Sequence, residues 1–244
     1  DWCSACVKAR AVDDPHTQVP DKPKPGLQIV EFDYIFPKSK AQNDGLQPVM
    51  CGYTKKKGYG FGGAALANGA SGDVSLVNQV VEWLKECGLH STPLRVRSDS
   101  EAAITSVTKT LATRRNRDGA TETVLEQSPV KSSSSLGGVE RFARTLGAMI
   151  RTIRQAVFDK YGIKIKARST AFAWLVTHAM FLYNRFQPRA NGLTPFEDVQ
   201  QHRYTSKLYE FGQFVLVRKL TALLQAKLEP RWVPCVWLGR SPTT

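Results

Sequence analysis

The sequence predicts an α/β fold, a mixed β-sheet with helices packed on it. Three observations lead to this prediction. Apolar, β-branched and aromatic residues form short strand-like runs. Between and after these runs, apolar residues recur at helical spacing. The resulting order is three strands, a helix, a strand, a helix, a strand and then helices, an order typical of a mixed sheet with flanking helices.

The predicted strands and helices divide the chain in a simple order. Lys55–Lys57 form the turn of an antiparallel meander between the second and third strands. Thr194 and Glu197 have the spacing of a capping box around Pro195, so a short helix is expected to begin there. The predicted strands are 27–36, 48–54, 58–66, 94–99 and 120–127, and the longer predicted helices are 75–87, 100–115, 138–160 and 169–186.

The first residues have the composition of a linker. Residues 11–26 contain four prolines among alternating charges, so the folded region is expected to begin near Leu27. The strand-like run that approaches Thr244 and the cysteines at the other end indicate a fragment of a longer polyprotein. We therefore expect an N-terminal piece at 1–10, a linker at 11–26, a core at 27–203 and a small β-rich segment at 204–244.

The charge of the chain favours a polyanionic partner. It has 34 Lys and Arg against 21 Asp and Glu, a formal net charge of +13. Basic side chains that neutralise phosphates release condensed counterions, which favours nucleic-acid binding. A solvated basic surface without a partner is the alternative. No run of 18 apolar residues occurs, so neither a membrane span nor a membrane partner is expected.

The chain has five cysteines, and this odd number argues against a secreted disulfide framework. Cys3 and Cys6 form a C-x2-C pair, which is half of a zinc site. Cys51, Cys87 and Cys235 stand singly among apolar neighbours and are expected to be small core residues.

Glycines at 58, 60, 62 and 63 raise the possibility of a nucleotide-binding loop. No Lys-Ser or Lys-Thr follows them, and the next residues continue a strand instead of opening a helix. We therefore interpret them as glycines of a strand in a hairpin.

Asp33 occupies a position that a strand disfavours. It interrupts the apolar run Val30 to Phe36, and a buried carboxylate there needs a cation, a metal or a raised pKa. In the alternative, this strand lies at an edge of the sheet and Asp33 faces water.

Two further acidic residues stand where elements meet. Asp99 ends the predicted strand 94–99, and ligand groups gather at the carboxyl ends of strands in α/β sheets. It could equally cap the helix after it. Glu140 lies in the first turn of a long helix, where the helix dipole favours it and Arg144 could pair with it at i+4. Together with Asp33, these carboxylates could hold two hard cations for in-line attack on phosphorus.

Taken in order, these residues resemble the integrase family of retroviruses and LTR retrotransposons. The clearest segment is 138–146 (GVERFARTL) around Glu140, supported by Ser98-Asp99, by 183–185 (YNR) and by 194–197 (TPFE). Residues 211–212, 227–228 and 235–239 are similar to the segment that follows the core in Copia-type polyproteins. Cys3 and Cys6 resemble the end of the family's His-His-Cys-Cys zinc domain.

The resemblance implies an RNase H-like fold and a DDE active site that processes DNA 3′ ends and transfers strands with Mg2+ or Mn2+. Its metal ligands would be Asp33, Asp99 and Glu140, and Cys3 with Cys6 would bind Zn2+ only together with His ligands upstream. The implied partners are element-end DNA, target DNA and further copies of the chain, and the implied location is intracellular, in the nucleus. A catalytically inactive nucleic-acid-binding remnant and an RNase H-like nuclease are the alternative functions.

Basic residues beside the implied site are candidates for DNA contact. Arg144, Arg151 and Arg154 lie near the face of the long helix opposite its apolar stripe, and Lys131 lies in the serine-rich loop before it. A solvated polar face is the alternative for each arginine.

Overall fold

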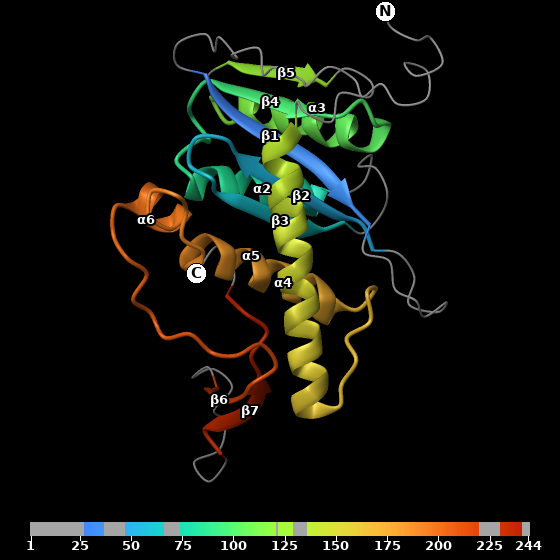
Figure 1. Cartoon of the computed structure of the whole chain (residues 1–244), viewed down its shortest axis with the longest axis vertical. Helices are drawn as coiled ribbons and strands as arrows, with labels where there is room; N and C mark the ends of the chain where they lie inside the picture. The colour runs from blue at the N-terminus through green and yellow to red at the C-terminus, as the bar shows by residue number, and fades with distance from the viewer. Residues whose placement is uncertain are drawn as a thin grey trace, which may run out of the picture.

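The computed structural model describes residues 27–36, 47–65, 74–120, 122–128, 136–219 and 230–240. At its centre is a five-stranded sheet in the order β3-β2-β1-β4-β5 (Figure 1). Strands β1, β2 and β3 are antiparallel neighbours, whereas β1 pairs with β4, and β4 with β5, in parallel. The strands are β1 (Gln28–Ile35), β2 (Val49–Thr54), β3 (Gly60–Ala64), β4 (Leu94–Ser98) and β5 (Thr123–Gln127).

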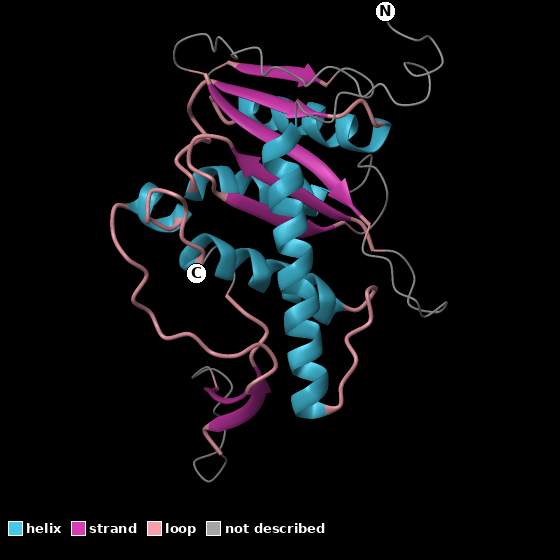
Figure 2. Ribbon diagram, in the orientation of Figure 1, coloured by secondary structure: helices cyan, strands magenta, loops and turns pink. Residues whose placement is uncertain are grey.

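Helices cover both faces of this sheet (Figure 2). On one face, α4 packs on β1 and β2, and α5 packs on β3 and on α4. On the other face, α2 and α3 pack on each other and on the strands. The helices are α2 (Val74–Glu86), α3 (Ala102–Arg117), α4 (Gly137–Tyr161), α5 (Thr170–Phe186) and the short α6 (Pro195–Gln200).

The predicted mixed sheet and each predicted element are confirmed, with ends shifted by a few residues. One boundary differs in a way that matters for the site. The helix predicted from residue 138 begins one residue earlier, so Gly137 and Gly138 both belong to the first turn of α4. Residues 129–135 before them lie outside the described part of the chain, as does the predicted linker at 11–26.

The glycines of β3 make room for the helices above them. A Cβ at Gly62 would lie 2.8 Å from Leu146 Cδ2, and one at Gly60 would overlap the ring of Phe142. On the opposite face of the sheet, Phe61 packs against Trp83 of α2. These glycines therefore lie in a strand that two helices approach closely, as the hairpin interpretation predicts.

Side chains of α5 fasten this helix to the sheet and to α2. The buried side chain of Asn184 accepts a hydrogen bond from the Gly60 N–H and donates one to the Gly60 carbonyl, both at 2.8 Å. Arg185 donates to Glu86 of α2 at 2.6 Å, and its guanidinium lies 4.2 Å from the centre of the Phe181 ring. The segment 183–185 is therefore structural in this chain.

Two smaller features of the sequence have a clear outcome. The capping box of α6 is present, with Thr194 accepting from the Glu197 N–H at 3.1 Å and Glu197 accepting from the Thr194 N–H at 2.8 Å. Cys51 and Cys87 are buried thiols as expected. Cys235 is not a core residue, because it is only half-buried in the strand Trp232–Val236 of a separate two-stranded sheet.

That second sheet follows the core. Strands β6 (Phe214–Arg218) and β7 (Trp232–Val236) pair antiparallel beside the far end of α4 (Figure 1). This sheet is the small β-rich tail that the fold-class prediction includes. Among the described residues, no helix has the length and apolarity needed to cross a membrane.

Replacement of Asn184 tests the attachment of α5. Asn184→Ala would leave the buried Gly60 N–H and carbonyl without partners, so the free energy of unfolding should fall by about 2 to 4 kcal/mol. Urea denaturation followed by circular dichroism measures this change. Asn191→Ala, in an exposed loop, is the matched control and should change the free energy by less than about 1 kcal/mol. Equal effects of the two variants would contradict the proposed role of Asn184.

Candidate active site

The candidate site lies where the parallel strands β1 and β4 end. The last paired residues of these strands are Phe32 and Ser98. Asp33 and Asp99 are the next residues after these two strand positions, so the sheet register brings them side by side. Adjacent strands are about 4.8 Å apart, a spacing that allows two carboxylates to share a cation.

Asp33 lies in the central strand and faces α4. It pairs with Cys51 on β2, so β1 has a neighbour on each side. The alternative in which Asp33 faces water from an edge strand is therefore wrong. Because side chains alternate along a strand, Phe32 points to the α2 face, where it packs on Trp83, and Asp33 points to the opposite face. There its side chain is half-buried.

Glu140 reaches the same region from α4. It lies in the first turn of that helix, and the residue before it, Val139, donates its N–H to Glu31 Oε2 at 2.9 Å. Glu31 is two residues before Asp33 and therefore on the same face of β1. The start of α4 is thus held directly on the strand that carries Asp33.

The charges of the other two candidate carboxylates act on Asp33. Its pKa is raised to about 6, first because burial disfavours the charged form and further because Asp99, Glu140 and Glu101 carry negative charge nearby. The Tyr34 N–H, which donates to Asp33 Oδ1 at 2.8 Å, opposes this rise. The structure therefore brings the three carboxylates named from the sequence into one electrostatic environment.

Helix capping and ion pairing do not fully explain why Asp99 and Glu140 are acidic. Asp99 Oδ1 accepts the Glu101 N–H at 3.1 Å, which shapes the turn before α3. It is not the N-cap of that helix, because the N-cap residue is Glu101. For Glu140, the expected ion pair with Arg144 is not among the ion pairs found in the described part of the chain.

The three candidate side chains are all carboxylates, the type of ligand that suits a divalent cation. Carboxylate oxygens are the ligands that Mg2+ and Mn2+ prefer, and a half-buried carboxylate with two others nearby is relieved by a cation. Within the described residues, however, no three His, Cys, Asp or Glu side chains lie close enough to one another to hold a metal ion. The side chains of Asp33, Asp99 and Glu140 would therefore have to converge when a cation binds.

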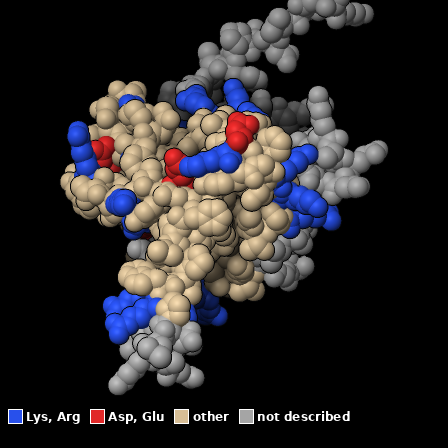
Figure 3. Space-filling view, turned by 90° about the horizontal axis from the view of Figure 1, so that it is seen from below, with Lys and Arg blue, Asp and Glu red and all other residues tan. Residues whose placement is uncertain are grey.

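The other residues predicted for binding have mixed outcomes. Arg144 and Arg151 are exposed on α4, whereas Arg154 donates to the Ile165 carbonyl at 2.7 Å and so also fastens the segment after α4. Lys131, Cys3 and Cys6 lie outside the described residues. Seen from below, Lys and Arg side chains surround a largely uncharged surface that has few acidic groups (Figure 3).

Sequence reasoning missed two acidic residues of this region. Glu31 is 1% exposed, and burial raises the pKa of its carboxyl. Glu101, an exposed residue at the start of α3, adds its charge to the environment of Asp33. The alternation Glu31-Phe32-Asp33 was the available signal, because it puts two carboxylates on one face of a strand.

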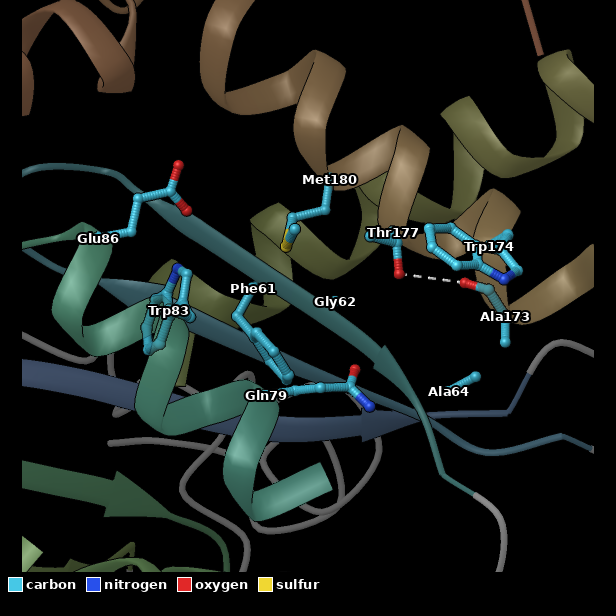
Figure 4. Close-up of a pocket in the computed structure, with 10 residues that line it drawn as sticks. All are labelled: Phe61, Gly62, Ala64, Gln79, Trp83, Glu86, Ala173, Trp174, Thr177 and Met180. Carbon is cyan, nitrogen blue, oxygen red and sulfur yellow. Dashed lines mark hydrogen bonds between the residues drawn. The ribbon is translucent and has the colours of Figure 1, made fainter. Parts of the chain in front are cut away.

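A cavity elsewhere in the molecule offers different chemistry. It has a volume of about 230 Å3 and lies between α2, β3 and α5, lined mostly by apolar and aromatic side chains (Figure 4). Two of its polar side chains already have partners, whereas the buried indole N–H of Trp83 has none among the described residues. Thr177 Oγ1 donates to the Ala173 carbonyl at 3.2 Å, and Glu86 binds Tyr59 and Arg185. None of the three candidate carboxylates lines this cavity.

Comparison with known proteins supports the fold. A chain of the simian T-cell lymphotropic virus intasome, solved by cryo-EM in complex with PP2A regulatory subunit B56 gamma, matches with a TM-score of 0.57 and 14% identity, over 95% of this chain and 76% of that one. The HTLV-2 integrase catalytic core domain in complex with magnesium (trimeric form) matches with a TM-score of 0.49 and 11% identity, over 71% and 97%. The BIV integrase catalytic core domain matches with a TM-score of 0.45 and 15% identity, over 72% and 95%.

No family model matches the sequence, and no curated protein matches it. The structural match to the intasome chain, together with the sheet order and the flanking helices, shows an integrase-like, RNase H-like fold. The predicted fold class is therefore confirmed.

The raised pKa of Asp33 predicts a pH-dependent stability difference. An aspartate in the unfolded chain titrates near pH 4, and Asp33 in the folded chain titrates near 6. The folded state is therefore penalised as pH rises from about 4 through 6. Without metal, Asp33→Asn should be more stable than the wild type by about 1 to 3 kcal/mol at pH 8, and the two should be nearly equal at pH 4. Urea denaturation at both pH values measures this, and a difference independent of pH would contradict the assignment.

Proposed function

We propose that this chain is the catalytic core of a retroelement integrase of the Copia type, which processes DNA 3′ ends and joins them to target DNA. The observation that carries the proposal is geometric: the sheet register puts Asp33 of the central strand beside Asp99, and the Glu31 contact holds the start of α4, which carries Glu140, on the same strand. A fold gains no stability from gathering carboxylates there, because their charges repel and burial disfavours them. A site that binds divalent cations needs this arrangement.

In this proposal, Asp33, Asp99 and Glu140 would hold Mg2+ or Mn2+. The bound metal supplies Lewis acidity, which lowers the pKa of an attacking water or hydroxyl and neutralises charge on the phosphate. The protein has to present ionised carboxylates, and Asp33 meets this condition above about pH 6. The Tyr34 N–H orients one oxygen of Asp33, and the Glu101 N–H orients one oxygen of Asp99.

DNA is the proposed substrate, both as element ends and as target. The net charge of +13 favours a polyphosphate, and exposed Arg144 and Arg151 on α4, the helix that begins with Glu140, could contact phosphates. Function as a homo-oligomer in the nucleus is part of the proposal, as is zinc binding by Cys3 and Cys6 if upstream His ligands complete the site. The domain division into a core at 27–203 and a β-rich segment at 204–244 is retained in it.

A strand-transfer assay with Mn2+ and labelled duplex DNA tests the proposal. Wild-type protein should join the labelled 3′ end to target DNA. Glu140→Gln removes one carboxylate from the proposed metal site, so the rate should fall by about 100-fold or more, with DNA binding retained. Asp159→Asn is the matched control, because Asp159 is an exposed acid at the other end of the same helix, and it should act like the wild type.

The products separate the proposal from its alternatives. Nicked DNA without joined product would indicate an RNase H-like nuclease. DNA binding without either product would indicate an inactive remnant. Full activity in Glu140→Gln would refute the proposed metal role of this residue.

A further inference from the structure

The first turn of α4 lacks a cap from its own sequence. The N-cap residue is Leu136, whose side chain has no hydrogen-bond acceptor and makes no capping bond. The first N–H groups of any helix have no partner within the helix, and a buried one left unpaired is unfavourable. In two other helices the N-cap side chain accepts such a bond: Ser169 in α5 and Thr194 in α6.

For α4 the acceptor comes from the central strand. Glu31 Oε2 accepts the Val139 N–H at 2.9 Å, and the Gly138 N–H also contributes a hydrogen bond that stabilises the ionised carboxylate. Glu31 is 1% exposed and lies 108 residues earlier in the chain. The contact therefore joins the helix that carries Glu140 to the strand that carries Asp33.

The approach of helix to strand is close enough to require glycine. A Cβ on Gly138 would lie 2.5 Å from Glu31 Oε2 and 2.9 Å from Tyr53 Cδ1, whereas a Cβ on Gly137 would meet nothing within 4 Å. The two neighbouring glycines thus differ in their demands. Gly138 is needed for the contact with Glu31, and Gly137 is not.

The charge of Glu31 is supported from several sides. Arg97 is its register partner on β4, and the charges of Arg97 and Lys55 favour the ionised form, as does the positive end of the α4 dipole. Burial opposes that form. A buried carboxylate is a poor way to gain stability, because apolar packing would serve as well. Its hydrogen bonds do, however, fix the orientation of the start of α4 relative to β1, which apolar packing does not.

We propose that Glu31 is a positioning residue: it fixes the first turn of α4 on β1 and so sets where Glu140 stands relative to Asp33. Side chains two residues apart on a strand share a face about 7 Å apart. Glu31 holds the turn at Gly138 and Val139, and the next residue, Glu140, therefore stands near Asp33. This inference rests on the proposed function, because a fixed position for Glu140 matters only if the carboxylates act together.

Four variants separate positioning from mere stability. Glu31→Leu removes the acceptor at similar size, and Glu31→Gln keeps an acceptor oxygen without the charge. Gly138→Ala pushes the helix away while leaving Glu31 intact, and Gly137→Ala is its matched control. Two readouts are used beside activity: amide hydrogen exchange at Val139 without metal, and Mn2+ affinity measured by electron paramagnetic resonance. Exchange at Gly60, whose N–H is bound by Asn184, reports whether the fold is intact.

Loss of the contact should loosen one turn and weaken metal binding together. In Glu31→Leu and Gly138→Ala, exchange at Val139 should speed up by about 10- to 100-fold while exchange at Gly60 is unchanged. Mn2+ affinity should fall by about 10- to 100-fold, as expected when a group that orients a ligand is lost. Glu31→Gln should restore most of both properties, and Gly137→Ala should match the wild type.

The opposing results are equally definite. Unchanged Val139 exchange or unchanged Mn2+ affinity in both Glu31→Leu and Gly138→Ala would overturn the inference, and so would equal losses in Gly137→Ala. If Glu31→Leu fails to fold, Gly138→Ala decides alone. Mn2+ affinity that is insensitive to Asp33→Asn would instead refute the proposed metal site, and the positioning role with it. Val139 exchange would then still show whether Glu31 holds the helix.

Discussion

The parallel pairing of β1 with β4 at the centre of the sheet is the constraint on which the candidate site depends. It stops at Phe32 and Ser98, so the next residue on each strand is an aspartate. Strand β1 has a strand on each side and α4 above it, so the carboxylate of Asp33 is partly shielded from water. No cationic residue is among the causes of its pKa shift. The neighbouring charges of Asp99 and Glu140 then make its position electrostatically unfavourable. The rest of the fold has to stabilise this arrangement.

It does so chiefly through the two helices on that face. Phe142 of α4 occupies the space left by Gly60, stacks on Tyr53 and meets Tyr183 edge to face. Asn184 in turn binds both backbone groups of Gly60. The glycines of β3, the aromatic residues beneath α4 and the amide of α5 thus hold the helix against the sheet. The hydrogen bond from Val139 to Glu31 fixes the position of the first turn of α4.

Much of the fold could be predicted from the sequence, because strands and long amphipathic helices have periodic patterns. The apolar stripe of α4 and the capping box of α6 are such local signals. The position of Asp33 in a disfavoured context also indicated the site. The sequence does not reveal that Glu31 caps α4, because the acceptor and the donor are 108 residues apart. Nor could it distinguish Gly137 from Gly138, a difference that depends on what stands within a few ångströms of each.

In the proposed function, Asp33, Asp99 and Glu140 form a shared site for divalent cations. Anomalous scattering from crystals of the chain grown with Mn2+ tests it most directly, because it locates the ion without reference to activity. We expect a manganese peak about 2.1 Å from carboxylate oxygens of Asp33 and Asp99, with Glu140 turned toward it. A well-ordered site with no manganese between these residues, at a pH above 7 where Asp33 is ionised, would contradict the account.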